Sequence, residues 1–142
     1  MRKEKVSKDK RIRILIADDQ ANVRKGLQVV LQLEDDLEVV GTAANGLEAV
    51  ELAERLSPDV ILMDLSMPHL DGWEAMRRIR DKKLPTMVIA LTTHGDLVSQ
   101  GTAEQAGAAA LIEKGAPESG LVQIIRSVCR ARSLTGKPPL PT

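Results

Sequence analysis

Short apolar runs alternate with amphipathic stretches along the chain, and their spacing predicts two kinds of element. The apolar runs are rich in aliphatic and β-branched residues, as in strands buried on both faces of a sheet. The predicted strands span Ile12–Ala17, Leu37–Gly41, Val60–Met63, Thr86–Leu91 and Ala109–Ile112. The stretches between them favour helices, and several place apolar residues three and four positions apart. The predicted helices span Asn22–Leu33, Gly46–Leu56, Gly72–Arg80, Asp96–Ala106 and Glu118–Arg132.

This strand–helix alternation predicts an α/β fold with a five-stranded parallel sheet. A parallel neighbour needs a right-handed crossover through a helix, so helices cover both faces of such a sheet. The 142 residues fit one domain, which we expect at 12–132. A mostly basic arm, 1–11, precedes it. A Pro-rich tail, 133–142, is typical of a linker or a disordered end.

Composition narrows the function classes without naming one. Lys plus Arg and Asp plus Glu are both 20, so the net charge of +0 gives no general attraction to nucleic acid or to anionic membranes. There is one Trp and no Tyr or Phe, which disfavours modules that stack bases on aromatic rings. The charged start is unlike a signal peptide, and no apolar run is long enough to span a bilayer. With the lone Cys129, these features predict a cytoplasmic protein without direct nucleic-acid or membrane binding.

Polar residues follow four of the predicted strands. Asp18 and Asp19 follow the first strand, Asp64 the third, Thr92 the fourth and Lys114 the fifth. The carboxyl ends of parallel strands share one edge of the sheet, and open α/β sheets bind ligands at that edge. We therefore expect these side chains to converge.

The set is chemically coherent. Crowded carboxylates repel one another, and a hard divalent cation with oxygen ligands such as Mg²⁺ relieves the repulsion. A carboxylate near such a metal is also a known nucleophile toward phosphorus, which makes this acidic set a candidate phosphoryl-accepting site. The Lys114 ammonium and the Thr92 hydroxyl would then neutralise or hydrogen-bond the phosphoryl oxygens.

Each residue alone also has an ordinary structural explanation. Asp18 or Asp19 can cap a helix, Asp64 can begin a turn, Thr92 can cap the helix after it, and Lys114 can be a solvated lysine. Their joint placement at separate strand ends is what favours a site.

Four segments carry a resemblance to a known family. They are ILIADDQANVRKGL, DVILMDLSMPHLDGWEAMRRIR, VIALTTHGD and GAAALIEKG. The chain closely resembles response-regulator receiver domains of the CheY-like superfamily from about Arg11 to Arg132, and its first segment looks most like receivers of NarL/FixJ-type transcription factors. The most specific piece is MDLSMPHLDG around Asp64. The resemblance implies a doubly wound (βα)₅ domain with the flavodoxin-like strand order 2-1-3-4-5.

The resemblance also implies roles. Asp64 would be the phosphoacceptor, and Mg²⁺ would be held by the acidic pair, with Asp19 as direct ligand, by Asp64 and by the backbone carbonyl of Ser66. Thr92 would be the switch hydroxyl and Lys114 the phosphate-binding cation. The phosphodonor would be a sensor histidine kinase, and phosphorylation would favour a homodimer.

Two positions depart from the family pattern. The family usually has Tyr or Phe three residues before its lysine, where this chain has Leu111. The family often has Pro directly after the lysine, where this chain has Gly115. Both departures concern how phosphorylation is transmitted rather than the phosphoryl chemistry.

Three other functions are alternatives to a receiver. An aspartyl-phosphate phosphatase commonly carries a second Asp two residues after its nucleophile, where this chain has Ser66, so we expect no enzyme of that kind. A nucleotide-binding domain has a Gly-rich turn after its first strand. This chain has acidic residues there, which would repel phosphate. A pseudo-receiver that acts without phosphorylation stays open, because the aromatic switch is missing.

Overall fold

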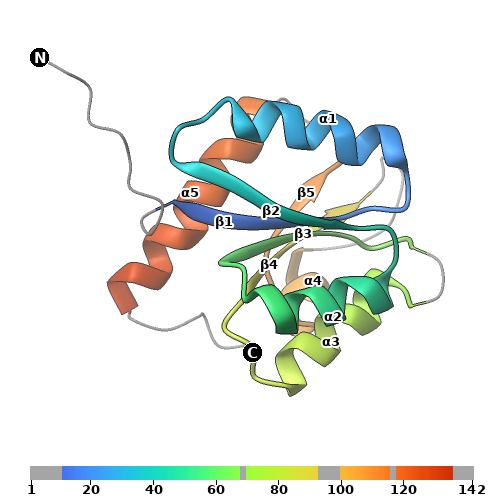
Figure 1. Ribbon diagram of the computed structural model, residues 1–142. Coiled ribbons are helices and arrows are strands. Elements are labelled where there is room, and N and C mark those ends of the chain that lie inside the picture. Colours follow the sequence, from blue (N-terminus) through green and yellow to red (C-terminus); the bar gives the residue numbers. More distant parts are fainter. Residues whose placement is uncertain (1–10, 68–69, 93–99, 116–117, 136–142) are drawn as a thin grey trace, which may run out of the picture.

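The computed structural model describes residues 11–67, 70–92, 100–115 and 118–135 (Figure 1). Its five parallel strands have the order β2-β1-β3-β4-β5, which confirms the predicted α/β sheet. The elements are β1 (Ile12–Ala17), α1 (Ala21–Gln32), β2 (Leu37–Ala43), α2 (Gly46–Leu56), β3 (Val60–Asp64), α3 (Gly72–Asp81), β4 (Met87–Thr92), α4 (Gln100–Gln105), β5 (Ala108–Glu113) and α5 (Glu118–Thr135).

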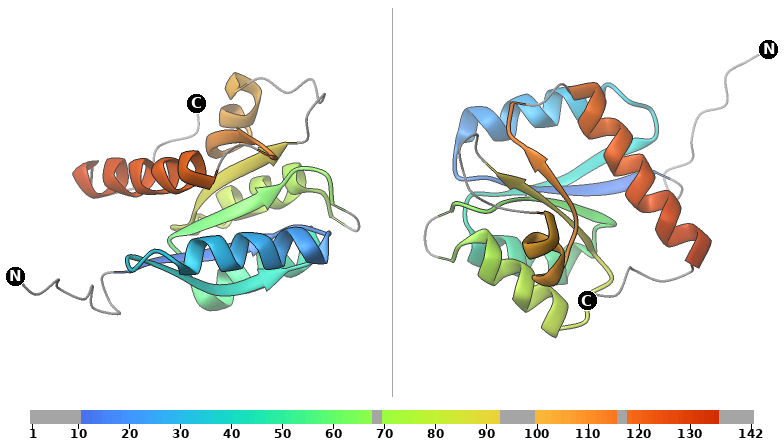
Figure 2. Two further views of the ribbon diagram at one scale, coloured as in Figure 1. Left: turned by 90° about the horizontal axis from the view of Figure 1, so that it is seen from above. Right: turned by 180° about the vertical axis from the view of Figure 1, so that it is seen from behind.

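Helices cover both faces of the sheet and create two apolar cores. Helices α1 and α5 lie on one face, and α2, α3 and α4 lie on the other (Figures 1 and 2). Successive strand residues point to opposite faces. In β1, Ile14 and Ile16 therefore join the core under α1 and α5, while Leu15 and Ala17 join the core under α2 and α3. This double burial explains why the strands are continuous apolar runs.

Several element ends differ from the prediction, although every predicted element exists. Strand β2 extends two residues past Gly41, because its pairing with β1 continues to Ala43 opposite Ala17. Helix α5 ends at Thr135 rather than Arg132. Positions 96–99 of the predicted fourth helix, arm residues 1–10 and tail residues 136–142 lie outside the described residues. Strand pairing and helix packing decide where β2 and α5 end, and the spacing of apolar residues in the sequence does not show these ends.

The start of α3 is pressed against the end of β3. Asp71 caps α3, its carboxylate accepting a hydrogen bond from the Glu74 N–H at 2.9 Å. The next residue, Gly72, has no room for a side chain, since an added Cβ would lie 2.1 Å from the Asp64 carbonyl oxygen. Glycine therefore permits the close approach that joins α3 to the strand end carrying Asp64.

A charged cluster holds α5 to the turn between α1 and β2. The Arg126 guanidinium donates to both carboxylate oxygens of Asp36, at 2.8 and 2.9 Å, and to Glu34 Oε1 at 2.8 Å. These hydrogen bonds raise the pKa of Arg126 above its usual value. Within the described part of the chain, no helix is both long and apolar enough to cross a membrane.

Candidate functional site

Three of the predicted site residues meet at the carboxyl edge of the sheet. Asp18 directly follows β1, Asp64 ends β3 and Lys114 directly follows β5. The Lys114 Nζ atom lies 2.8 Å from Asp18 Oδ2 and 3.0 Å from Asp64 Oδ2. The side chains of Asp18 and Asp64 are 0% and 2% exposed, so this ammonium is held between two buried carboxylates.

A third carboxylate, Asp19, completes an acidic cluster. Ligand oxygens of Asp18, Asp19 and Asp64 all lie within 4.8 Å of one another. Asp18 is buried and its Oδ1 accepts a hydrogen bond from the Gln20 N–H at 2.9 Å, whereas Asp19 is exposed. Three carboxylates face one ammonium at this edge. The local charge therefore remains negative, and the oxygen donors suit a hard cation.

Burial and pairing shift the ionisation of Asp64 and Lys114. Burial raises the pKa of the Asp64 carboxyl, and hydrogen bonds from the Ser66 N–H and from Lys114 only partly oppose it. Burial by itself would lower the pKa of Lys114, but hydrogen bonds and charge from Asp18 and Asp64 raise it overall. At neutral pH, Lys114 is therefore a firmly protonated cation beside Asp64.

Thr92 and Ser66 sit next to this cluster. Thr92 is the buried last residue of β4, and its carbonyl oxygen accepts a hydrogen bond from the Lys114 N–H at 2.7 Å. Ser66 is exposed, and its N–H donates to Asp64 Oδ1 at 3.0 Å. The backbone at these two positions thus fixes Lys114 and Asp64 relative to the strand ends.

Leu111 lies on β5, the strand next to β4, which carries Thr92. It pairs with Ala90 of β4, is half-buried, and packs against the core formed with α2, α3 and α4. An apolar side chain therefore occupies the position where the resemblance predicts an aromatic ring.

Comparison with known proteins shows to which family the chain belongs. The family model described as "Response regulator receiver domain" matches residues 14–126. The chain belongs to the response-regulator receiver family. This match confirms the resemblance inferred from the sequence. It covers β2 to β5 and α1 to α4 entirely, and β1 and α5 in part.

Individual relatives agree with this family. The transcriptional regulatory protein YhcZ of Bacillus subtilis (strain 168), itself uncharacterized, is 44% identical over 112 residues, which are 79% of this chain and 52% of YhcZ. The signal receiver domain of the putative response regulator NarL from Mycobacterium tuberculosis superposes with a TM-score of 0.81 at 31% identity, covering 87% of this chain and 99% of that one.

A third comparison is with a complex whose description names BeF₃ and Mg²⁺. The CheX–CheY–BeF₃–Mg²⁺ complex from Borrelia burgdorferi includes a chain that matches at TM-score 0.76 and 25% identity, covering 82% of this chain and 88% of that one. Among eight curated relatives, the chain spans between 31% and 60% of their lengths. The shared part is the receiver domain.

The structure of the receiver domain adds two residues that the sequence analysis missed. The Arg24 guanidinium of α1 donates to the Asp18 carbonyl at 2.7 Å and so steadies the acidic loop. Gly72 brings α3 against Asp64. An arginine one turn into the helix after an acidic pair, and a glycine after a capping Asp, were the available signals.

Proposed function

We propose that this receiver domain accepts a phosphoryl group on Asp64 in a Mg²⁺-dependent reaction, with a sensor histidine kinase as donor. The observation that carries the proposal is the buried Asp64 carboxylate, 3.0 Å from the Lys114 ammonium and inside a cluster of three carboxylates. A carboxylate in a surface turn and a solvated lysine stay in contact with water, so these ordinary roles do not explain why the charges are buried together.

The residues present fit Mg²⁺. Asp18, Asp19 and Asp64 supply oxygen ligands within 4.8 Å of one another, and the Ser66 backbone carbonyl is the further proposed ligand. Mg²⁺ prefers oxygen and retains water, so few protein ligands suffice. When bound, the ion would neutralise negative charge on the phosphoryl oxygens. A receiver structure that holds BeF₃ and Mg²⁺, the CheY complex described above, supports this fit.

The chain's own residues would divide the reaction as follows. A carboxylate oxygen of Asp64 attacks phosphorus, a P–O bond forms, and the P–N bond to the kinase histidine breaks. Burial makes this carboxylate more basic than an ordinary one, because it raises the pKa. Lys114 is already 3.0 Å from Asp64 and would pair with the new phosphoryl charge, while Thr92 would donate its hydroxyl.

Phosphorylation is the test that separates the candidate functions. The protein is incubated with acetyl phosphate and Mg²⁺, and the intact mass is measured. A receiver gains one phosphoryl group, Asp64→Asn abolishes the gain, and Asp81→Asn, an exposed carboxylate at the end of α3, leaves it unchanged. Turnover of many acetyl phosphate molecules would indicate a phosphatase, and an unmodified wild type would indicate a pseudo-receiver.

Metal binding has its own reporter. Trp73 follows Gly72, which abuts the Asp64 carbonyl, so its fluorescence should respond when Mg²⁺ enters the acidic cluster. We expect the response to be much smaller in Asp19→Asn. An identical titration in both proteins would contradict the assignment of Asp19 as a ligand.

Signalling past Asp64 should depend little on β5. Leu111 has neither the volume nor the polar tip of an aromatic switch residue, and burying one leucine is worth only about 2 kcal/mol. We propose that phosphorylation is retained while the response at β5 is small. Amide NMR shifts with and without beryllofluoride, in wild type, Leu111→Tyr and Thr92→Ala, test this. A large wild-type response centred on β5 and unaffected by Leu111→Tyr would contradict it.

Self-association completes the proposal. Helix α5 buries its apolar face against the sheet, so the surface that it offers a second copy is its polar side, which carries Arg126, Arg130 and Arg132. We propose that phosphorylation favours a weak homodimer, without direct nucleic-acid binding by this domain. Sedimentation of the unmodified and the beryllofluoride-treated protein measures the change, and a monomer at high concentration in both states would refute it.

A further inference from the structure

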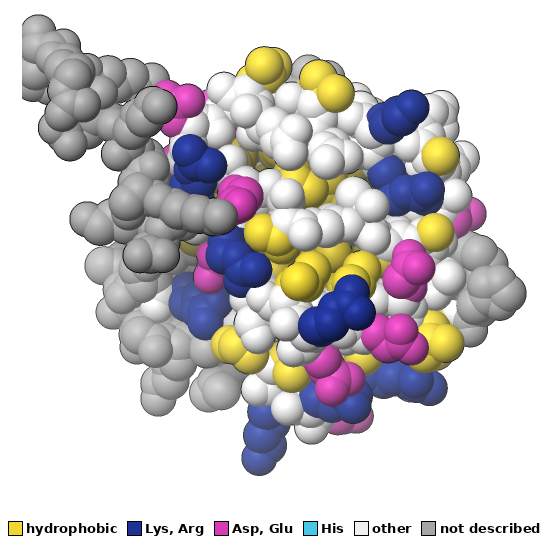
Figure 3. Space-filling model, viewed as in Figure 1, with side chains coloured by type: hydrophobic (Ala, Val, Ile, Leu, Met, Phe, Trp, Pro, Cys, Tyr) yellow, Lys and Arg dark blue, Asp and Glu magenta, His cyan; other side chains and the backbone are white. Residues whose placement is uncertain are grey.

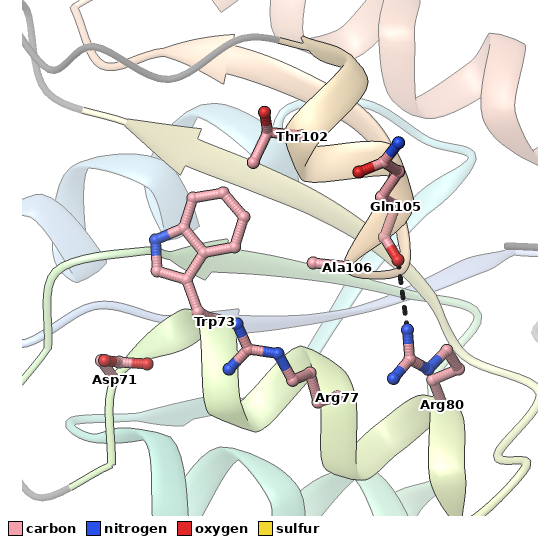
Figure 4. Close-up of a pocket in the computed structure, with 7 residues that line it drawn as sticks. All are labelled: Asp71, Trp73, Arg77, Arg80, Thr102, Gln105 and Ala106. Carbon is pink, nitrogen blue, oxygen red and sulfur yellow. Dashed lines mark hydrogen bonds between the residues drawn. The ribbon is translucent and has the colours of Figure 1, made fainter. Parts of the chain in front are cut away.

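An open groove of about 500 Å³ lies between α3 and α4, outside the acidic cluster. Trp73, Arg77 and Arg80 lie on the α3 side, and Thr102, Gln105 and Ala106 on the α4 side (Figure 4). Asp71 also lines the groove, and its carboxylate is engaged as the cap of α3. None of the proposed phosphorylation residues lines it. The groove therefore needs an explanation of its own.

The α3 side of the groove is one continuous stripe. Positions 73, 77 and 80 are separated by four and three residues, so they share one face of the helix. Trp73 is the only aromatic residue of the chain. It is half-buried and packs against the core cluster, and the rest of the side chain borders the groove. One part of the indole ring is thus held by the core, and the other part is accessible from the groove.

The two guanidiniums border the groove, and their carboxylate partners are exposed side chains 3.4 Å away. Arg77 contacts Glu74 at 3.4 Å, and their side chains are 48% and 44% exposed. Arg80 contacts Asp81 at 3.4 Å and donates to the Gln105 carbonyl at 3.1 Å. Exposed pairs of this length contribute little, and each guanidinium has five N–H donors, more than these contacts use. Both arginines can therefore bind carboxylates.

We propose that this groove docks an acidic, extended segment of a partner protein. Trp and Arg are the residues most enriched at the energetic centres of protein interfaces, and here they are adjacent. A guanidinium fork matches a carboxylate in two parallel hydrogen bonds. The groove is open and largely polar, whereas small-molecule sites enclose most of the ligand in apolar walls. These features favour a peptide segment as occupant.

Helix geometry gives the spacing of the segment. At 1.5 Å per residue, Trp73 and Arg77 are about 6 Å apart along α3, and Arg80 lies about 4.5 Å further. An extended chain advances about 3.3 Å per residue. Alternate residues of an extended segment share one face, so an apolar residue followed by acidic residues two and four positions later presents all three side chains to the groove.

The surrounding surface argues for local recognition rather than general charge attraction. Figure 3 shows basic and acidic side chains interspersed over the part of the surface formed by α2 and α3. Arg78, on the next position of α3, pairs with Glu74 at 3.5 Å and is 45% exposed, but does not line the groove. It is a matched control for Arg77, since both have the same charge, exposure and partner.

The probe is the peptide acetyl-Gly-Leu-Ser-Glu-Ser-Glu-Gly-amide, with the two Glu replaced by Gln as the neutral control. Binding to the unmodified protein at low salt is followed by Trp73 fluorescence and by amide NMR shifts. We expect saturable binding of the acidic peptide, with NMR shifts centred on α3 and α4. Arg77→Gln should weaken it at least about tenfold, and Arg78→Gln less than about twofold.

Several outcomes would overturn the proposal. They are equal binding of the neutral peptide, equal weakening by Arg77→Gln and Arg78→Gln, or no saturable binding up to about 1 mM, a limit of about 4 kcal/mol. Competition by ATP with the same shifts and the same Arg77 dependence would assign the groove to nucleotides instead. Far-UV circular dichroism of both exposed-arginine variants verifies the fold. Because the unmodified protein is used, failure here leaves the phosphorylation test unaffected.

Discussion

Replacing Lys114 by Met should destabilise the metal-free protein strongly, because it leaves two buried carboxylates without their cation. The Lys114 Nζ atom lies 2.8 Å from Asp18 and 3.0 Å from Asp64, whose side chains are almost completely buried. Methionine keeps the length and the apolar stem of the side chain and removes only the charge.

The expected loss follows from the distances and from burial. Each pair attracts by about 6 kcal/mol at an effective dielectric constant of about 20. Desolvation of the ammonium offsets much of this attraction, and removing one partner of a buried pair typically costs about 3–5 kcal/mol. The Lys114 side chain is 17% exposed, so solvent screens part of the interaction. We expect the free energy of unfolding to fall by about 3 kcal/mol.

Urea unfolding in EDTA at neutral pH measures this loss, with Lys82→Met as control. Lys82 pairs with Glu54 at 3.1 Å, a similar distance, but the side chains are 46% and 47% exposed. The same substitution there should change stability by less than about 1 kcal/mol. Equal losses in the two variants, or a Lys114→Met protein as stable as wild type, would refute the reasoning from burial.

The pH dependence gives a second check on the same variant. Burial already raises the pKa of Asp64 in the folded protein, and Lys114 partly counters this. Without the ammonium the folded-state pKa should rise further. A carboxyl with a raised folded-state pKa stabilises below its unfolded pKa, and this contribution is lost as pH rises. The deficit of Lys114→Met should therefore shrink as pH falls toward about 4. A deficit independent of pH would contradict this account.

Three further predictions use other parts of the fold. Gly72→Ala should destabilise the protein by about 1–3 kcal/mol and slow phosphorylation, because the added Cβ meets the Asp64 carbonyl. Gly26→Ala, at a helix position with nothing within 4 Å, should stabilise the protein by about 0.5–1 kcal/mol. Urea unfolding of both variants tests the contrast. Burial raises the pKa of Cys129 to about 11. At pH 8 a thiol reagent should therefore label the folded protein about a hundredfold more slowly than the unfolded protein, and labelling of the folded protein should speed up as pH rises. Equal labelling rates would contradict the burial of Cys129. Arg126→Leu should lower stability by about 1 kcal/mol in low salt and less in high salt, and a loss that salt does not change would exclude the ion pairs as its cause.

Much of the fold was predictable because local physics specifies it. Continuous apolar runs and amphipathic stretches gave all ten elements, and their alternation gave the parallel sheet. The rule that strand ends share one edge also placed Asp18, Asp64 and Lys114 together, and the structure confirms their contact. Element ends were less accurate, as at β2, where hydrogen bonding to β1 extends the strand past Gly41.

The sequence by itself determined which residues reach the site edge, because strand periodicity and chain direction are local properties. Tertiary structure decided how they are used. Asp18 and Asp19 are identical neighbours in the chain, yet one is buried against Lys114 and the other is exposed. The partners of Arg126 lie 90 and 92 positions away, and the α3–α4 groove joins helices from different crossovers. Such relations depend on side-chain direction and on packing between distant segments, which no local pattern of residues encodes.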